Sequence, residues 1–102
     1  MVLLERDEMA ELEIPGLVQE ARRRGIEVLL VPVPDLHAPA VDQAERVARE
    51  SIAQVRAGKN VVIHCRGGLG RAGTLAACCC IRLGLDAQTA MAKVREVRPG
   101  AI

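Results

Sequence analysis

The segment from residue 61 to residue 80, VVIHCRGGLGRAGTLAACCC, constrains the fold more than any other part of this sequence. It begins with an apolar, β-branched run that is typical of a buried strand, and it ends with a longer apolar run that is typical of a covered helix. Four glycines, Gly67, Gly68, Gly70 and Gly73, lie between or inside these runs. A buried strand that passes through a flexible loop into a helix indicates an α/β domain, in which such loops lie at the ligand-binding edge of the sheet.

The rest of the chain alternates between the same two kinds of element. Strands are predicted at residues 2–4, 26–33 and 60–65 from their β-branched and apolar composition. Helices are predicted at residues 15–24, 39–57, 72–83 and 87–97 from their apolar periodicity, and the charged segment 5–11 is left without an assignment. This order predicts an α/β fold, with a small parallel-type central sheet flanked by helices, in a single domain spanning residues 1–102.

Composition limits the partners of such a domain. The chain has no Phe, Tyr or Trp, and its formal net charge is only +1. A charge so close to zero provides no general field for nucleic acid or for an anionic membrane surface, so we expect neither partner. No run approaches the roughly 20 apolar residues of a membrane span, and the first residues are too polar for a signal peptide. We therefore expect a soluble, cytoplasmic protein.

The four cysteines do not form the pattern of a disulfide framework or a metal site. Cys78, Cys79 and Cys80 are consecutive, Cys65 stands apart, and no CxxC pair occurs. We expect reduced thiols, no metal and no cofactor. Because Cys80 lies nearly opposite Arg82 on a helix, it is predicted to be the most deeply buried of the three consecutive cysteines. One of them could also protect Cys65 as a disulfide partner, which is a separate hypothesis.

The glycine loop has the features of an anion site. Glycines allow positive φ angles, so that successive N–H groups can point inward, and a helix start adds positive potential. The loop lacks both the GK[ST] end of a Walker loop and the GxGxxG pattern of dinucleotide-binding domains. It has instead Cys65 at its base and Arg71 six positions later. These surroundings favour a thiolate, which is a nucleophile, and a guanidinium can present two parallel donors to a tetrahedral oxyanion.

The sequence HCRGGLGR resembles the HCxxGxxR phosphate-binding loop of the cysteine-based protein tyrosine phosphatase superfamily. Within it, the GGLGR part is most similar to the dual-specificity branch and to the cyclin-dependent kinase inhibitor 3-like phosphatases. VPVPD, about thirty residues before the cysteine, resembles the general-acid loop of that group, and VRPGAI resembles its segment after the last helix. The resemblance covers most of the chain and implies a dual-specificity phosphatase-like core.

This resemblance implies a role for each matching residue. Cys65 is the nucleophile, Arg71 binds the phosphate, and Asp35 is the general acid and base, with Asp42 as the alternative carboxylate. His64 supports the loop and the thiolate. The phosphate-binding set is Arg66, Gly67, Gly68, Leu69, Gly70 and Arg71. The implied substrate is a phosphorylated protein or a small phosphomonoester, with phosphotyrosine first and phosphoserine and phosphothreonine as further candidates.

The chain departs from the family pattern at two places. The family has Ser or Thr after the arginine, where its hydroxyl assists hydrolysis of the phosphocysteine, whereas this chain has Ala72 there. Thr74, two residues further on, is the candidate substitute. Relatives also have further strands before residues 2–4 and further sequence after residue 102. A minimal or truncated form of the domain is therefore expected, and its exposed sheet edge would favour dimerisation.

Two alternative functions remain open from the residues. A rhodanese-like sulfurtransferase or an arsenate reductase also places a cysteine at the base of an anion loop, but the glycine spacing, Arg71 and the upstream acid loop speak against them. A non-catalytic phosphate-binding module would agree with Ala72 and with the short ends. Thiocyanate formation from thiosulfate would indicate the first alternative, and phosphopeptide binding without phosphate release would indicate the second.

Overall fold

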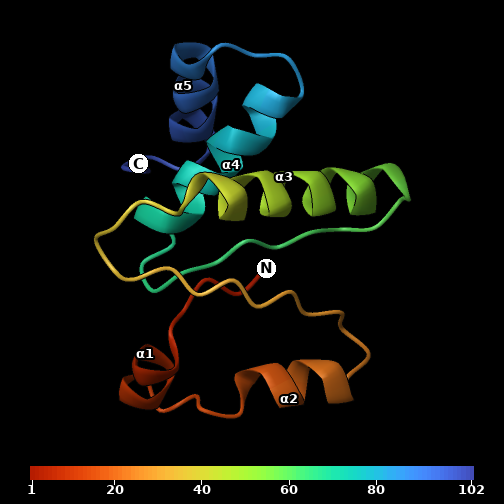
Figure 1. The fold of residues 1–102 in the computed structure, drawn as a ribbon, viewed down its shortest axis with the longest axis vertical. Coiled ribbons are helices and arrows are strands. Elements are labelled where there is room, and N and C mark those ends of the chain that lie inside the picture. Colours follow the sequence, from red (N-terminus) through yellow and green to blue (C-terminus); the bar gives the residue numbers. More distant parts are fainter.

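The helices lie on both sides of a layer of extended chain in the computed structural model, which describes residues 1–102 (Figure 1). Helices α1 (Arg6–Glu11) and α2 (Leu17–Arg23) cover one side of this layer. Helices α3 (Val41–Arg56) and α4 (Gly70–Arg82) cover the other side, and α5 (Ala87–Val97) packs against α4. None of the helices has the length and apolar character needed to cross a membrane.

The layer between the helices consists of three extended segments that run parallel. Val2, in the middle, forms one parallel bridge with Leu30 and another with His64. The N–H of Val2 donates to the carbonyl of Leu29 at 2.9 Å, and the N–H of His64 donates to the carbonyl of Met1 at 3.1 Å. The predicted parallel arrangement is present, but the predicted regular strands are not, because each side has only an isolated bridge. The physical reason is the length of the middle segment, which has only a few extended residues before α1 begins.

Side chains of the middle segment alternate between the two sides of the layer. Leu3 belongs to the largest cluster, on the α3 and α4 side, whereas Val2 and Leu4 pack with Met9 on the α1 side. Leu3 and Leu4 are 0% and 1% exposed, so both faces of this segment are covered, as in a parallel sheet. The largest cluster contains Leu3, Val31, Val47, Cys65, Ala72 and Leu75. Cys65 is therefore held by the core.

Four of the helices match the periodicity of the sequence: α5 has the predicted bounds, and the ends of α2, α3 and α4 are shifted by one or two residues. Asp86 caps α5 as predicted, since its carboxylate accepts from the N–H of Thr89 at 2.9 Å. Helix α4 begins at Gly70, earlier than the predicted residue 72, so the helix start reaches into the glycine loop. Helix α1 was not predicted, because its sequence RDEMAE is mostly charged. Its N-terminus is stabilised by a contact in which the Glu8 carboxylate accepts from the N–H of Glu5 at 3.1 Å.

The prediction that Cys80 is the most buried of the consecutive cysteines stays a prediction, since Cys78, Cys79 and Cys80 are all half-buried. Helix α4 contacts both α3 and α5, so it has two covered faces. Cys80 packs against the cluster that contains Ala77 and Ala90. Burial raises the pKa of the Cys78 and Cys79 thiols, which disfavours their thiolate forms.

Candidate active site

The glycine loop presents a set of unpaired N–H groups. It leaves the extended layer at Cys65 and enters α4 at Gly70, and Gly68 adopts a left-handed φ of 71°. The N–H groups of residues 66–72 donate to no acceptor of the chain. Free N–H groups at a glycine turn and a helix start attract an anion, because they carry partial positive charge and need hydrogen-bond acceptors.

Cys65 and the predicted acid lie on the wall of one cavity of about 590 Å³. Cys65 is 8% exposed and is backed by Ala72 and Leu75 in the core cluster. The cavity lining also contains Asp35 and Arg71, which come from different parts of the chain. The complete lining is Asp35, Leu36, His37, Ala38, Cys65, Arg66, Gly67, Gly70, Arg71 and Thr74. The structure therefore brings the three predicted catalytic side chains to one cavity.

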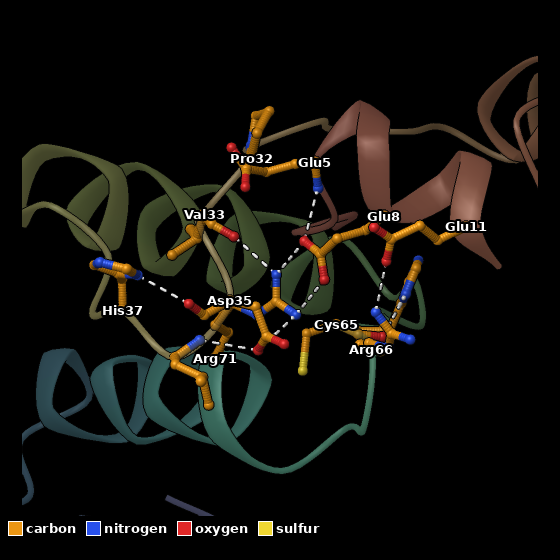
Figure 2. Close-up of polar contacts among 12 residues, drawn as sticks. Glu5, Glu8, Glu11, Pro32, Val33, Asp35, His37, Cys65, Arg66 and Arg71 are labelled. Carbon is orange, nitrogen blue, oxygen red and sulfur yellow. Dashed lines mark hydrogen bonds and ion pairs between the residues drawn. The ribbon is translucent and has the colours of Figure 1, made fainter.

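The Arg71 guanidinium is fixed by a buried carboxylate. Figure 2 shows it against Glu8, whose Oε1 accepts from Nη1 at 2.6 Å and whose Oε2 accepts from Nη2 at 2.8 Å. The carbonyl of Val33 accepts a further hydrogen bond from Nη1 at 2.8 Å. Arg71 and Glu8 are only 4% and 7% exposed, so this two-point contact is shielded from water. A planar guanidinium held in this way cannot rotate freely.

Arg71 has two donors that its buried partners, Glu8 and Val33, do not use. Nε makes no hydrogen bond within the chain, and Nη2 has a second contact, at 3.2 Å, with Oδ1 of Asp35. Nε and Nη2 form the side edge of the guanidinium, which presents two parallel donors to an oxyanion. The hydrogen bonds from Arg71 lower the pKa of Glu8, and the same contact raises the pKa of Arg71, so both groups are charged at neutral pH.

Asp35 lies on a loop that is shaped by its own polar contacts. Its Oδ1 accepts from the N–H of Leu36 at 2.9 Å, and its carbonyl contacts Nδ1 of His37 at 2.8 Å. Leu36 has a left-handed φ of 64°, which turns the chain sharply after the aspartate. The Asp35 side chain is half exposed at the cavity, within reach of solvent and substrate. Asp42, the alternative carboxylate, lies in the first turn of α3 and does not line the cavity.

The remaining predicted site residues have separate positions. His64 does not line this cavity; its Nδ1 contacts the carbonyl of Cys65 at 3.4 Å, beside the base of the loop. Thr74 lines the cavity, and its hydroxyl donates to the carbonyl of Gly70 at 2.8 Å. Arg66 lies at the rim and pairs with Glu11 of α1 at 3.1 Å. Gly68 and Leu69 belong to the loop but are not part of the cavity lining.

Glu8 is the important site residue that the sequence reasoning missed. It belongs to α1, which begins directly after the extended segment that ends at Leu4. The carboxyl ends of parallel segments meet at one edge, so residues that follow Leu4 lie near those that follow Val33 and Cys65. The available signal was a carboxylate soon after each of the first two segments, Glu8 after Leu4 and Asp35 after Val33. The sequence did not show that Arg71 is the partner of Glu8.

Cys78, Cys79 and Cys80 lie in the second half of α4, eight to ten residues after its first residue, Gly70. All four cysteines are free thiols in the structure. A protecting disulfide between one of them and Cys65 stays a hypothesis. No group of three or more His, Cys, Asp or Glu side chains is arranged to hold a metal ion.

A cysteine at the base of a loop of free N–H groups, with an arginine at its end, defines a phosphate-loop protein of the α/β type. Residues 9–102 match the family described as PTP-SAK, a Swiss Army Knife protein, DSP-PTPase phosphatase domain. The chain belongs to this family of dual-specificity protein tyrosine phosphatase domains. The prediction of family membership from HCRGGLGR is confirmed, and so is the α/β class of the fold.

Individual relatives agree with this assignment. Cyclin-dependent kinase inhibitor 3 of Rattus norvegicus is 31% identical, over 99% of this chain and 49% of the relative. The protein of the same name from Mus musculus is 32% identical with the same coverage. The chain thus spans about half the length of the curated relatives it matches.

Solved structures show the same fold. The active form of Tk-PTP has a TM-score of 0.87 and 42% identity, over 99% of this chain and 66% of that chain. A kinase associated phosphatase, whose catalytic-site cysteine was replaced by serine, has a TM-score of 0.93 and 27% identity, over 99% of this chain and 58% of that chain.

Proposed function

We propose that the chain is a cysteine-dependent protein phosphatase of the dual-specificity type. One observation carries the proposal: Cys65 lies at the base of a loop with free N–H groups, in a cavity shared with the fixed guanidinium of Arg71 and with Asp35. The family match and the replaced catalytic-site cysteine of the related phosphatase support it. They favour phosphatase chemistry over the sulfurtransferase and arsenate reductase alternatives.

In the first chemical step, the thiolate of Cys65 attacks phosphorus, and a P–S bond forms as the bond to the leaving oxygen breaks. The free N–H groups of the loop and the side edge of Arg71 hold the other three phosphate oxygens. Asp35 donates its proton to the leaving oxygen. The contact of Asp35 with Nη2 of Arg71 gives way to the phosphate, because a dianion is a stronger partner for a guanidinium donor than a single carboxylate is.

In the second step, water attacks the phosphocysteine. The Asp35 carboxylate accepts a proton from this water, the P–S bond breaks, and inorganic phosphate leaves the Cys65 thiolate. His64 supports the base of the loop through the carbonyl of Cys65. Thr74 is the available hydroxyl at the start of α4, although in the present conformation it donates to Gly70. All of these residue roles are part of the proposal.

The proposed substrates are phosphorylated proteins, with phosphotyrosine first and phosphoserine and phosphothreonine as further candidates. Only three of the ten lining residues are hydrophobic and none is Phe, Tyr or Trp, which agrees with a tolerant site. We also propose that the domain is single, that it acts in the cytoplasm, and that its three extended segments serve as the central sheet. Dimerisation through an edge of these segments, where Val62 is 70% exposed, is part of the same proposal.

The direct test is hydrolysis of para-nitrophenyl phosphate by the wild type and by Asp35→Asn without added metal. We expect turnover by the wild type between about pH 5 and pH 8. Asp35→Asn is expected to lower kcat by about a hundredfold and to flatten the basic limb of the pH profile, because the proton donor is lost. Asp42→Asn is the matched control and should leave the profile unchanged. Equal effects of the two substitutions, or absence of turnover by the folded wild type, would contradict the proposal.

Ala72 is expected to slow the second step. It is 6% exposed and packs in the same core cluster as Cys65, so a serine hydroxyl at this position would lie close to the sulfur that must leave phosphorus. Ala72→Ser should raise the steady-state rate by roughly tenfold and reduce the initial burst of para-nitrophenol. Stopped-flow absorbance measures both quantities, with Ala76→Ser, on the same helix, as the control. An unchanged burst would show that phosphocysteine hydrolysis does not limit the wild type.

A further inference from the structure

The segment after α5, residues 98–102, holds the outer side of the glycine loop. Arg98 donates from Nη2 to the carbonyl of Gly67 and from Nε to the carbonyl of Gly68, both at 3.3 Å. The N–H of Ile102 donates to the carbonyl of Leu69 at 3.1 Å. Three successive carbonyls of the loop are thus bonded by one segment that lies thirty residues further along the chain.

These bonds determine where the loop N–H groups point. A trans peptide unit is planar, and its C=O and N–H point in opposite directions. The carbonyls of Gly67, Gly68 and Leu69 share their peptide units with the N–H groups of Gly68, Leu69 and Gly70. Holding the three carbonyls on the outer side therefore turns these three N–H groups to the opposite side. They are among the free N–H groups that the proposed function assigns to phosphate.

The charge of Arg98 strengthens this arrangement. A hydrogen bond from a charged donor to a carbonyl is stronger than one between neutral groups. It also polarises the peptide units of Gly67 and Gly68, which increases the partial positive charge on the N–H at their other ends. Without such a partner, glycine residues would readily adopt other φ and ψ angles, since they have no side chain to restrict them.

Residues 98–102 are themselves held in position by contacts with α4 and α5. Arg98 follows the last helical residue of α5, and its N–H donates to the carbonyl of Val94 at 2.8 Å. Ala101 is 1% exposed and packs over Gly73, where an added Cβ would lie only 3.1 Å from the Cβ of Ala101. Arg95 donates from Nε to the carbonyl of Ala101 at 3.0 Å. Close approach to α4 at Gly73 therefore sets the position of the whole segment.

We propose that Arg98 is a positioning residue that, together with the main chain of Ile102, holds the glycine loop in its anion-binding conformation. The inference rests on the proposed function for the identity of the anion. It assigns to Arg98 an action on the far side of the loop, through carbonyls, without contact with the substrate. Arg98 does not line the cavity that contains Cys65, in agreement with this indirect role.

Binding of tungstate, a phosphate-like oxyanion, tests the inference without requiring turnover. Calorimetric titration of the whole protein should give a dissociation constant about tenfold higher for Arg98→Met than for the wild type, because two charged hydrogen bonds to the loop are lost. Arg98→Lys, which keeps the charge and one donor point, should recover part of this loss. Lys93→Met is the matched control: it removes the same charge from an exposed position of α5 that makes no hydrogen bond or ion pair, and it should bind as the wild type does.

A purely structural role would give a different pattern. It would lower the thermal midpoint of Arg98→Met and leave the tungstate affinity of the folded protein unchanged, which would overturn the inference. Equal weakening by Lys93→Met would also overturn it, since the effect would then be one of general charge. If Arg98→Met does not fold, Arg98→Lys provides the test. Weaker binding of tungstate by Arg98→Lys than by the wild type would support the inference, and equal binding would overturn it.

The same titration separates this inference from the proposed function. A wild type that binds tungstate but releases no phosphate would contradict the enzyme proposal alone, and the comparison of the Arg98 variants would still decide the role of this residue. A folded wild type that does not bind tungstate would overturn both.

Discussion

Replacement of Cys65 with serine is expected to abolish phosphate release, with a loss of at least about ten-thousandfold in kcat. A serine hydroxyl at this site remains protonated and has no general base beside it, so it cannot form the covalent intermediate. The substitution is nearly isosteric, and Cys65 is held by the core cluster with Ala72 and Leu75, so the loop should keep its shape. Turnover of para-nitrophenyl phosphate measures the loss.

If Cys65 is the nucleophile and not a structural residue, the Cys65→Ser protein must still bind a phosphate-like anion. Cys65→Ser should therefore bind tungstate with an affinity close to that of the wild type, because the loop N–H groups and Arg71 are unchanged. Cys78→Ser, which removes a half-buried thiol from the far end of α4, is the matched control and should retain turnover. Turnover by Cys65→Ser at the wild-type rate would show that Cys65 is not the nucleophile.

Removal of the Glu8 carboxylate is expected to be the most destabilising single change in the site. Glu8→Ala leaves the Arg71 guanidinium buried without its two-point partner, which in comparable buried pairs lowers the free energy of unfolding by about 3–5 kcal/mol. This is a large part of the total stability of a small domain, which is about 5–15 kcal/mol. Urea denaturation followed by circular dichroism measures the change.

Helix α1 contains its own control for this prediction. Glu11 pairs with Arg66 of the same loop, but its side chain is 65% exposed, so Glu11→Ala should change the free energy of unfolding far less. Glu8→Gln should weaken tungstate binding as well, because the guanidinium loses the charge that orients it. Similar destabilisation by Glu8→Ala and Glu11→Ala would show that burial of the first pair does not matter.

The Glu8 pair also makes the stability depend on pH in the acid range. Arg71 lowers the pKa of the Glu8 carboxyl in the folded protein below its ordinary value of 4.5, so the unfolded chain binds a proton more readily than the folded protein does. The contribution of the pair is therefore present above pH 4.5 and is lost as the pH falls through the lowered pKa of the folded state. Glu8→Gln should reduce this loss when denaturation is compared across the acid range.

Local sequence patterns were sufficient to predict the glycine loop and most of the helices. The order of an apolar run, Cys65, three glycines and Arg71 is continuous in sequence, and its chemistry depends on residues that are neighbours along the chain. Helices α2, α3, α4 and α5 followed from apolar periodicity and from stop and cap residues such as Asp86, since these signals act over a few residues. Asp35 was placed correctly at the cavity because the loop after a parallel segment lies at the same edge as Cys65.

Long-range contacts explain what could not be predicted. Regular strands were expected from composition, but strand pairing depends on how many residues the partner segment offers, and the middle segment is short. The burial of Cys80 cannot be read from the position of Arg82 alone, because the covered faces of α4 depend on both α3 and α5.

The sequence by itself determined that a cysteine, a glycine loop and an arginine stand together in the pattern of the phosphatase family, because these features lie within eight consecutive residues. Only the tertiary structure decided how the arginine is held and what keeps the loop open toward the anion. Glu8 is 63 residues from Arg71, and Arg98 is about 30 residues from the carbonyls that it contacts. The sequence around a charged residue does not indicate which distant residue it will contact. Such pairs can therefore be identified only in the folded structure, where the two groups lie together.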